Sequence, residues 1–291
     1  MPTYEESAPA KVNLMLRVGE KRADGYHEIE SLIAFADKGD KVFFTPGTDN
    51  AYSLEVEGPT AEGAGPDKDN LVLKAARALA KKVPGLKRGH FRLVKNLPSG
   101  AGLGGGSSDA AAALRLLARA NKIKADDPRL LAAAKETGAD VAVCLDPKAR
   151  LIGGIGDVLS KPLKLPVMYA TLVWPGVPVP TPLVYGAHDG FRDPPSELGI
   201  DAASIPSKKK DFANFLHLYA NDLAKAARSI TPLIASAEQL IDEVGDATLI
   251  RMTGSGSAVF ALYETKSEAR EAAESIKEER AAWWVAVATL R

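Results

Sequence analysis

The chain has 291 residues, which is long enough to bury a sizeable core in one large or two medium-sized domains. Thirty-seven basic and 37 acidic residues give a formal net charge of zero, which argues against nucleic-acid binding by the chain as a whole. The N-terminus lacks the basic and apolar regions of a secretion signal, and no apolar run approaches membrane-spanning length. We therefore expect a soluble cytoplasmic protein, a monomer or homodimer, with neither nucleic-acid nor membrane partners.

The cysteine and histidine content gives no sign of a metal site. The single cysteine, Cys144, lies in an apolar run and is expected to be a buried packing residue. The four histidines are scattered along the chain, so no group of Cys and His has metal-ligand spacing.

The first part of the chain predicts strands followed by a helix. Residues 8–18 alternate between apolar and polar side chains, which is typical of a strand, and its polar positions include Lys11 and Asn13. That pair is either a solvated outer face or part of a site, and the residues alone favour neither. A turn leads from there into Tyr26 and His27. Further strands are predicted at 28–35, 40–45 and 52–56, and an amphipathic helix at 70–80.

A glycine-rich stretch, Pro98–Ser108, lies between a strand predicted at 90–97 and a helix that runs to Ala120. Five of the seven residues from 100 to 106 are glycine, so backbone N–H groups can converge on an anion while the helix adds its positive dipole end. Ser107, Ser108 and Asp109 are good N-cap residues, and we expect the helix to begin there. The alternative is a loop without a ligand, although each such glycine costs up to about 1 kcal/mol of chain entropy.

Two common nucleotide motifs do not account for this stretch. It lacks the Gly-Lys-Ser/Thr ending of a P-loop. It does contain G-x-G-x-x-G at Gly100, Gly102 and Gly105, but a dinucleotide site also needs an acidic residue at the end of the next strand. Asp126 and Asp127 have the required distance in sequence and lie instead between two helices, so the dinucleotide interpretation is weak.

The remaining sequence predicts a second lobe. A helix at 129–137 is followed by Asp140 before an apolar run, where an acid is either a helix cap or a functional group. A strand at 168–174 precedes a polar, turn-rich segment, 186–210, that is expected to be a surface excursion or partly disordered. The order that follows is helix, two strands, helix and strand, which is typical of a ferredoxin-like α/β sandwich. Its expected elements are 233–244, 248–252, 258–263, 266–280 and 283–289.

Three separated segments, Pro9–Leu14, Leu97–Ser108 and Thr253–Ser257, together resemble the GHMP kinases, which phosphorylate galactose, homoserine, mevalonate and related alcohols. The resemblance implies an α+β fold with two lobes. An N-terminal, ribosomal-protein-S5-like lobe that binds ATP would span residues 1–161, and a C-terminal, ferredoxin-like α/β sandwich lobe would span residues 162–291.

Within that superfamily, five segments resemble the kinases of the methylerythritol phosphate route to isoprenoid precursors: Ala10–Leu14, Arg22–His27, Gly104–Ser108, Gly138–Val141 and Val179–Pro182. The substrate of those kinases is a cytidylyl-linked methylerythritol. Two departures are Val141-Ala-Val-Cys144, where that family usually has Val-Pro-Phe-Phe, and Asn221-Asp222-Leu-Ala, where Asn-Asp-Leu-Glu is more usual. We assign no role to the second segment. The alternatives are a mevalonate- or homoserine-type kinase and a nucleotide-binding regulator with a degenerate active site.

The resemblance implies a role for individual residues. Asp140 is the base that accepts the proton of the substrate's 2-hydroxyl, and Lys11 is the catalytic lysine. Tyr26 and Tyr185 sandwich the cytosine, His27 meets its edge, and Asn13 and Thr181 bind the methylerythritol or its diphosphate. Mg²⁺ is expected with the co-substrate ATP, although the sequence identifies no carboxylate ligand for it. The residues expected to bind ATP are Pro98, Ser99, Gly100, Ala101, Gly102, Leu103, Gly104, Gly105, Gly106, Ser107 and Ser108, with Lys95 and Asn70 at the adenine end.

Overall fold

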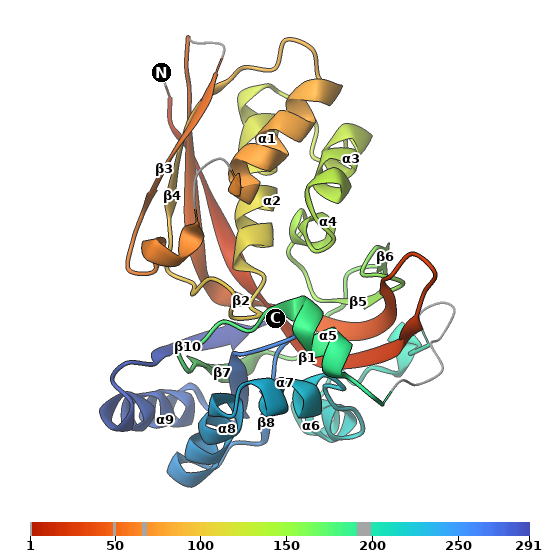
Figure 1. Ribbon diagram of the computed structural model, residues 1–291, viewed down its shortest axis with the longest axis vertical. Coiled ribbons are helices and arrows are strands. Elements are labelled where there is room, and N and C mark those ends of the chain that lie inside the picture. The colour runs from red at the N-terminus through yellow and green to blue at the C-terminus, as the bar shows by residue number, and fades with distance from the viewer. Residues whose placement is uncertain (1, 49–50, 66–68, 191–198) are drawn as a thin grey trace. The chain divides into compact units, whose positions relative to one another are not determined.

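The computed structural model describes residues 2–48, 51–65, 69–190 and 199–291, and they form two compact units (Figure 1). The segments of the units alternate along the chain, because the long strands β1 (Tyr4–Lys21) and β2 (His27–Pro46) contribute to both. The first unit comprises 1–10, 39–99 and 104–147, and the second comprises 11–38, 100–103 and 148–291. The two lobes predicted on either side of residue 161 therefore remain a prediction about the family's domains.

The sheet of the first unit contains the first residues of β1, the later part of β2 and two shorter strands. β1 pairs with β2, and β4 (Gly89–Val94) lies between β2 and β3 (Tyr52–Glu57), antiparallel to β2 and parallel to β3. Phe44 of β2 is directly opposite Phe91 of β4, and both side chains are fully buried, with ring centroids 4.7 Å apart. This aromatic pair fixes the register of the sheet because a shift of one residue would move it to the opposite face.

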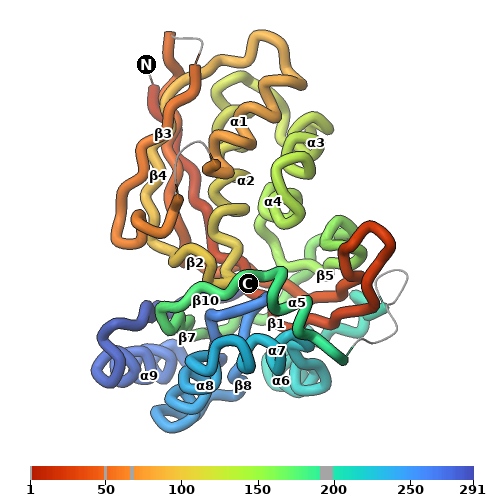
Figure 2. The backbone as a smooth tube through the Cα atoms, in the orientation of Figure 1, coloured from red at the N-terminus to blue at the C-terminus, as the bar shows by residue number. Residues whose placement is uncertain are grey.

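Helices cover one face of this sheet, and α1 (Leu71–Lys82) and α2 (Gly105–Ala120) lie side by side there (Figures 1 and 2). Most of α2 is buried, and its many alanines allow neighbouring helices to approach closely. α3 (Pro128–Thr137) and the short α4 (Val141–Cys144) pack against α1 and α2, and Cys144 is buried as predicted. A 3₁₀ turn, η1 (Ala61–Ala64), follows β3.

The second unit contains the ferredoxin-like arrangement that the sequence predicts. Its antiparallel strands have the order β10 (Trp284–Leu290), β7 (Met168–Trp174), β9 (Val259–Tyr263) and β8 (Leu249–Met252). α8 (Leu233–Val244) and α9 (Lys266–Glu279) pack on the sheet and share one apolar core with it. A reciprocal pair of hydrogen bonds between Thr265 and Glu268 caps the start of α9.

The second unit also contains elements that the sequence does not predict. β5 (Arg150–Gly153) and β6 (Val158–Leu159) form an antiparallel hairpin. Of the predicted excursion at 186–210, residues 191–198 lie outside the described part of the chain, and the remainder includes η3 (Ala202–Ser204). Three helices were missed, because proline or polar residues at their starts resemble turns: α5 (Thr181–Ala187), α6 (Lys209–His217) and α7 (Ala224–Ile230).

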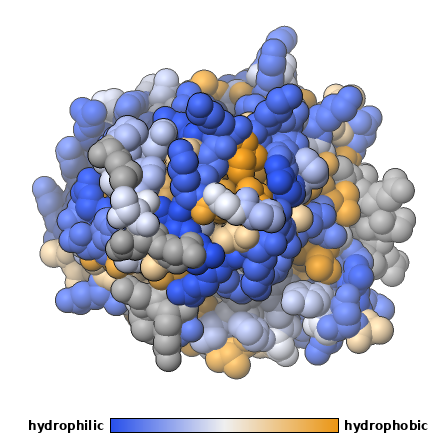
Figure 3. All heavy atoms as spheres, turned by 90° about the horizontal axis from the view of Figure 1, so that it is seen from above, coloured by the Kyte–Doolittle hydropathy of each residue, from blue (hydrophilic) through white to orange (hydrophobic). Residues whose placement is uncertain are grey.

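The surface is mainly polar on the face drawn in Figure 3, where hydrophobic residues form separate, small groups. None of the helices described is both long enough and apolar enough to span a lipid bilayer.

Candidate functional site

The helix after the glycine stretch begins earlier than predicted. Gly104 adopts a left-handed conformation (φ 64°, ψ 17°), and α2 begins at Gly105. The predicted start at Ser107 to Asp109 is wrong because the side chains of Ser108 and Asp109 have other partners. Ser108 Oγ donates to the Pro9 carbonyl at 2.7 Å, and Asp109 pairs with a buried lysine.

This early start leaves the first turn of α2 without a side-chain cap among the described residues. The first N–H groups of a helix lack intrahelical partners, and Gly105 and Gly106 carry no side chain of their own that could keep a ligand away. Such a helix end favours an anion through both its N–H groups and its dipole. The local backbone therefore supports the predicted phosphate site.

The middle of the glycine stretch packs against the second glycine loop, Thr253–Ser257, within the second unit. Ala258 N donates to the Ala101 carbonyl at 2.9 Å. Gly102 has a φ of 81°, and a Cβ on it would lie 2.8 Å from the carbonyl oxygens of both Thr253 and Gly256. Because only glycine combines this conformation with this close approach, the two loops are matched at Gly102.

Lys11 and Asn13 form the start of a buried polar chain on β1. Their exposed fractions are 4% and 3%, so the solvated-face alternative is wrong. Lys11 Nζ donates to Asn13 Oδ1 at 3.0 Å, and Asn13 Nδ2 donates to Ser31 Oγ at 2.8 Å. Ser31 Oγ in turn donates to the Met15 carbonyl, which fixes the orientation of the Asn13 amide. The Lys11 ammonium group is therefore buried and hydrogen-bonded, as a buried charge must be. Its catalytic role remains a prediction.

Two further polar residues, Thr253 and Asn221, hold the second glycine loop against this chain. Thr253 Oγ1 accepts a hydrogen bond from Asn13 N at 2.8 Å. Asn221 Nδ2 donates to the carbonyls of Met252 and Gly254, each at 2.8 Å. The sequence interpretation missed both residues. Their signal was present, since Thr253 opens a segment shared with GHMP kinases and Asn221 lies in a segment to which we assigned no role.

The predicted cytosine-binding residues lie in the second unit. Tyr26 follows the turn between β1 and β2 and is 59% exposed. Hydrogen bonds of the turn, from Tyr26 N to Asp24 and from Arg22 N to the Tyr26 carbonyl, fix its backbone. The His27 ring lies 5.3 Å from that of Tyr185 on α5, at an angle of 37°. The structure therefore brings two of the three predicted side chains into contact.

Thr181, the other predicted substrate residue on α5, contacts the second glycine loop. Its Oγ1 lies 2.8 Å from Ser255 Oγ, within hydrogen-bond distance. Thr181 is thus linked through this loop to the neighbourhood of Asn13, which Thr253 contacts.

Asp140 belongs to the first unit and immediately precedes α4. It occupies the N-cap position, but its side chain makes no capping hydrogen bond to that helix. The alternative that Asp140 serves only as a helix cap is therefore not supported. Its role as a base remains a prediction.

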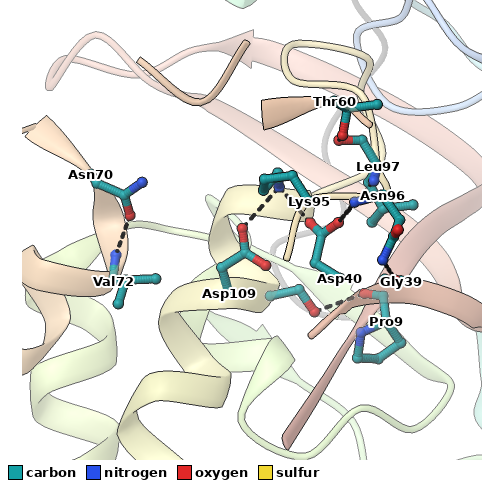
Figure 4. Close-up of polar contacts among 11 residues, drawn as sticks. Pro9, Gly39, Asp40, Thr60, Asn70, Val72, Lys95, Asn96, Leu97 and Asp109 are labelled. Atoms are coloured by element: carbon teal, nitrogen blue, oxygen red, sulfur yellow. Dashed lines mark hydrogen bonds and ion pairs between the residues drawn. The ribbon is translucent and has the colours of Figure 1, made fainter. Parts of the chain in front are cut away.

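The residues predicted to line the adenine have structural partners in the first unit. Asn70 Oδ1 accepts from Val72 N at 2.9 Å and caps the start of α1 (Figure 4). Lys95 is buried, and its Nζ pairs with Asp40 and Asp109. The contact of either residue with a nucleotide remains a prediction.

The described residues contain no group of three or more His, Cys, Asp or Glu that could hold a metal ion. The Mg²⁺ expected with ATP remains a prediction.

Comparisons with known proteins connect these features to one family. Residues 70–147 match the GHMP kinases N terminal domain, and residues 204–282 match the GHMP kinases C terminal family. A 4-diphosphocytidyl-2-C-methyl-D-erythritol kinase of Xanthobacter autotrophicus is 50% identical to the chain, with 100% of both chains covered. The enzyme of the same name from Azorhizobium caulinodans is 46% identical, with 98% of each chain covered.

Solved structures give the same result. A crystal structure of 4-(cytidine 5'-diphospho)-2C-methyl-D-erythritol kinase has a TM-score of 0.76 and 34% identity, and 99% of each chain is covered. A homoserine kinase from Cytophaga hutchinsonii has a TM-score of 0.71 at 18% identity, covering 100% of this chain and 95% of its own. That second likeness concerns the fold alone. The two matched domains and the first structure confirm the predicted GHMP kinase architecture.

Proposed function

We infer the role of each residue from the premise that this chain belongs to the 4-diphosphocytidyl-2-C-methyl-D-erythritol kinases, a family of GHMP kinases. It is an ATP-dependent phosphotransferase of the methylerythritol phosphate route to isoprenoid precursors, and it phosphorylates the 2-hydroxyl of the cytidylyl substrate. The matched proteins carry this name over the full length of the chain, so the activity predicted from the sequence is confirmed.

The start of α2 is the observation that carries the assignment of the ATP phosphates. Its first turn lacks a side-chain cap among the described residues, and Gly104, Gly105 and Gly106 leave the backbone accessible. Transfer of a γ-phosphoryl group depends mainly on positioning and charge stabilisation, which fixed N–H groups and a helix dipole supply. We assign the phosphates to residues 98–108 on this basis.

Asp140 and Lys11 are assigned to the reacting hydroxyl. A carboxylate that does not cap its own helix can accept the hydroxyl proton, provided that it lies within hydrogen-bond reach in the substrate complex. Lys11, held by Asn13, supplies a positive charge that keeps a carboxylate ionised and offsets the charge of the transferring group.

Tyr26, His27 and Tyr185 are assigned to the cytosine, and Asn13 and Thr181 to the remainder of the substrate. The exposed Tyr26 ring can stack on a base, and stacking on an aromatic ring contributes about 1–3 kcal/mol per base. This free energy favours a cytidylyl substrate over a bare alcohol. The contact of Tyr185 with His27 places a second ring and a polar ring edge together.

Magnesium is proposed as a companion of ATP and not as a resident metal. Mg²⁺ commonly keeps several water ligands and takes its other ligands from phosphates. Because the described residues lack a metal-binding cluster, we propose that the ion enters with the nucleotide. The bound ion would neutralise part of the phosphate charge.

A substrate panel tests the function directly. The purified chain is assayed with ATP and Mg²⁺ against the cytidylyl-linked methylerythritol, homoserine and mevalonate, and phosphorylation is followed by the formation of ADP and of the phosphorylated product. We expect turnover of the cytidylyl substrate and little of the other two. Faster phosphorylation of homoserine or mevalonate would overturn the assignment, and nucleotide binding without any turnover would favour the regulator.

A further inference from the structure

Three charged side chains of the first unit, Asp40, Lys95 and Asp109, form a buried cluster next to both ends of the glycine stretch (Figure 4). Lys95 Nζ pairs with Asp40 and lies 2.9 Å from Asp109 Oδ2. The exposed fractions of the three side chains are 4% or less. Because removal of charges from water is costly, a cluster of this kind is poor evidence for stability and suggests a more specific use. We call these three residues the Lys95 cluster.

The cluster is hydrogen-bonded to the backbone just before the glycine stretch. Asp40 Oδ1 accepts hydrogen bonds from Asn96 N at 2.6 Å and from Leu97 N at 2.8 Å. Asn96 Nδ2 also donates to the Gly39 carbonyl, next to Asp40 in the sequence. One carboxylate therefore fixes two consecutive peptide units immediately upstream of Pro98.

The same cluster includes the residue that directly follows the stretch. Asp109 is the residue that follows Ser108 on α2, and its Oδ2 accepts from Lys95 Nζ. A Cβ on Gly105 would lie 3.4 Å from Lys95 Nζ and 3.6 Å from Asp40 Oδ2. The cluster is thus in contact with the first residue of α2, where the uncapped N–H groups begin. A single lysine joins the two ends of the stretch.

We propose that Asp40, Lys95 and Asp109 are positioning residues, which hold the glycine stretch and the first turn of α2 in the geometry that binds the ATP phosphates. This inference rests on the proposed assignment of the phosphates to residues 98–108. It gives Lys95 an indirect role through two acids, in place of the direct contact with adenine that the sequence predicts.

The charge of the cluster provides a readout that a purely structural role would lack. Burial raises the pKa of Asp109; Lys95 opposes this effect and Asp40 adds to it. These two residues, on β2 and just after β4, are the charged groups that act on Asp109. When Asp109 is protonated, the charges of Lys95 and Asp40 cancel and the cluster is neutral. Loss of the Asp109 proton adds a negative charge close to the proposed phosphate site. Repulsion then weakens ATP binding as the pH rises.

The decisive variants are Asp109→Leu and Asp109→Asn. Asp109→Leu removes the link to Lys95, and we expect the KM for ATP to rise about ten-fold while the KM for the cytidylyl substrate stays within about two-fold. Asp109→Asn retains an acceptor for Lys95 and resembles the protonated acid, because Asp109 Oδ1 has no hydrogen-bond partner among the described residues. At neutral pH the KM of Asp109→Asn for ATP should be close to that of the wild type. At alkaline pH this KM should rise in the wild type and not in the variant.

Asn121→Ala is the matched control on the same helix. Asn121 Oδ1 accepts from Lys87 N and its Nδ2 donates to the Leu117 carbonyl, so the change destabilises the other end of α2. We expect a lower melting temperature with the KM for ATP unchanged. If Asn121→Ala and Asp109→Leu raise this KM equally, or if Asp109→Leu lowers only the melting temperature, the positioning role is wrong.

A double-variant cycle separates positioning from direct contact. If Lys95 acts through Asp109, Lys95→Met and Asp109→Leu together should weaken binding of a non-hydrolysable ATP analogue less than the product of the single effects. Fully multiplicative effects would mean that Lys95 contacts the nucleotide by itself, and would overturn the inference. Should Asp109→Leu not fold, Lys95→Met takes its place, because it removes the link to both acids: an unchanged KM for ATP in a folded Lys95→Met protein contradicts the role. Calorimetric binding of the analogue to the wild type tests the phosphate site independently.

Discussion

Lys11 Nζ donates a hydrogen bond to Asn13 Oδ1 at 3.0 Å, although both residues lie on one strand two positions apart. Side chains at positions i and i+2 of a strand share a face, and here that face is buried. Asn13 also donates to Ser31 and, through its backbone, to Thr253, so its amide has one orientation. The acceptor for the proposed catalytic lysine is therefore fixed by contacts from two other segments, β2 and the second glycine loop.

Asn13→Ala should lower activity more than it lowers stability. The change leaves Lys11 Nζ and Ser31 Oγ without this amide, and a buried polar group that loses its partner costs about 1–3 kcal/mol. We expect kcat to fall about 10- to 100-fold with little change in the KM for ATP. Steady-state kinetics and thermal melting measure the two effects. A drop in melting temperature with full activity would show that the Lys11–Asn13 contact serves stability alone.

Asp140→Asn should abolish phosphoryl transfer while nucleotide binding persists. The amide cannot accept the hydroxyl proton as a base, and loss of a general base costs about 10²- to 10⁴-fold in rate. Dissociation constants for an ATP analogue and single-turnover rates separate the two properties. Asp126→Asn, a change of an exposed aspartate, is the control and should behave as the wild type. Retained turnover in Asp140→Asn would remove Asp140 from the mechanism.

Tyr26→Ala should weaken binding of the cytidylyl substrate and leave the KM for ATP nearly unchanged. Loss of one base stack, about 1–3 kcal/mol, corresponds to an increase of roughly 5- to 100-fold in the KM of that substrate. Tyr26→Phe keeps the ring and is expected to retain most of the affinity. Because the Tyr26 side chain is exposed, neither change should lower the melting temperature much. Equal losses for both substrates would contradict the stacking role.

The alternating patterns were sufficient to predict most strands and helices. The glycine segments were sufficient to predict the family of the chain. The predicted start of α2 was two to four residues too late, because N-cap propensity is local, whereas Ser108 and Asp109 hydrogen-bond to Pro9 and Lys95 outside the helix. The same limit applies to Lys11. Its burial depends on β2 and on the second glycine loop, which pattern analysis of β1 alone does not include.

Asn221 shows why some residues that shape the candidate site escape sequence analysis. Its hydrogen bonds reach the carbonyls of Met252 and Gly254, about thirty residues later in the chain, and no periodic pattern encodes such contacts. The three unpredicted helices were missed for the same physical reason, because contacts distant in sequence stabilise them. α5 is a short helix with a proline in its first turn, and short helices are stable mainly through tertiary packing.

Gly102→Ala tests whether the two glycine loops must meet closely. A non-glycine residue at positive φ costs about 1–2 kcal/mol by itself, and here the new Cβ would also lie 2.8 Å from two carbonyl oxygens. Gly176→Ala is the matched control, because Gly176 has a similar φ of 85° and a Cβ there would meet no atom of the described residues within 4 Å beyond its chain neighbours. We expect Gly102→Ala to lower the melting temperature more than Gly176→Ala does, and to reduce kcat/KM for ATP about ten-fold or more. Equal effects of the two substitutions would mean that backbone strain, and not the contact between the loops, explains the glycine at position 102.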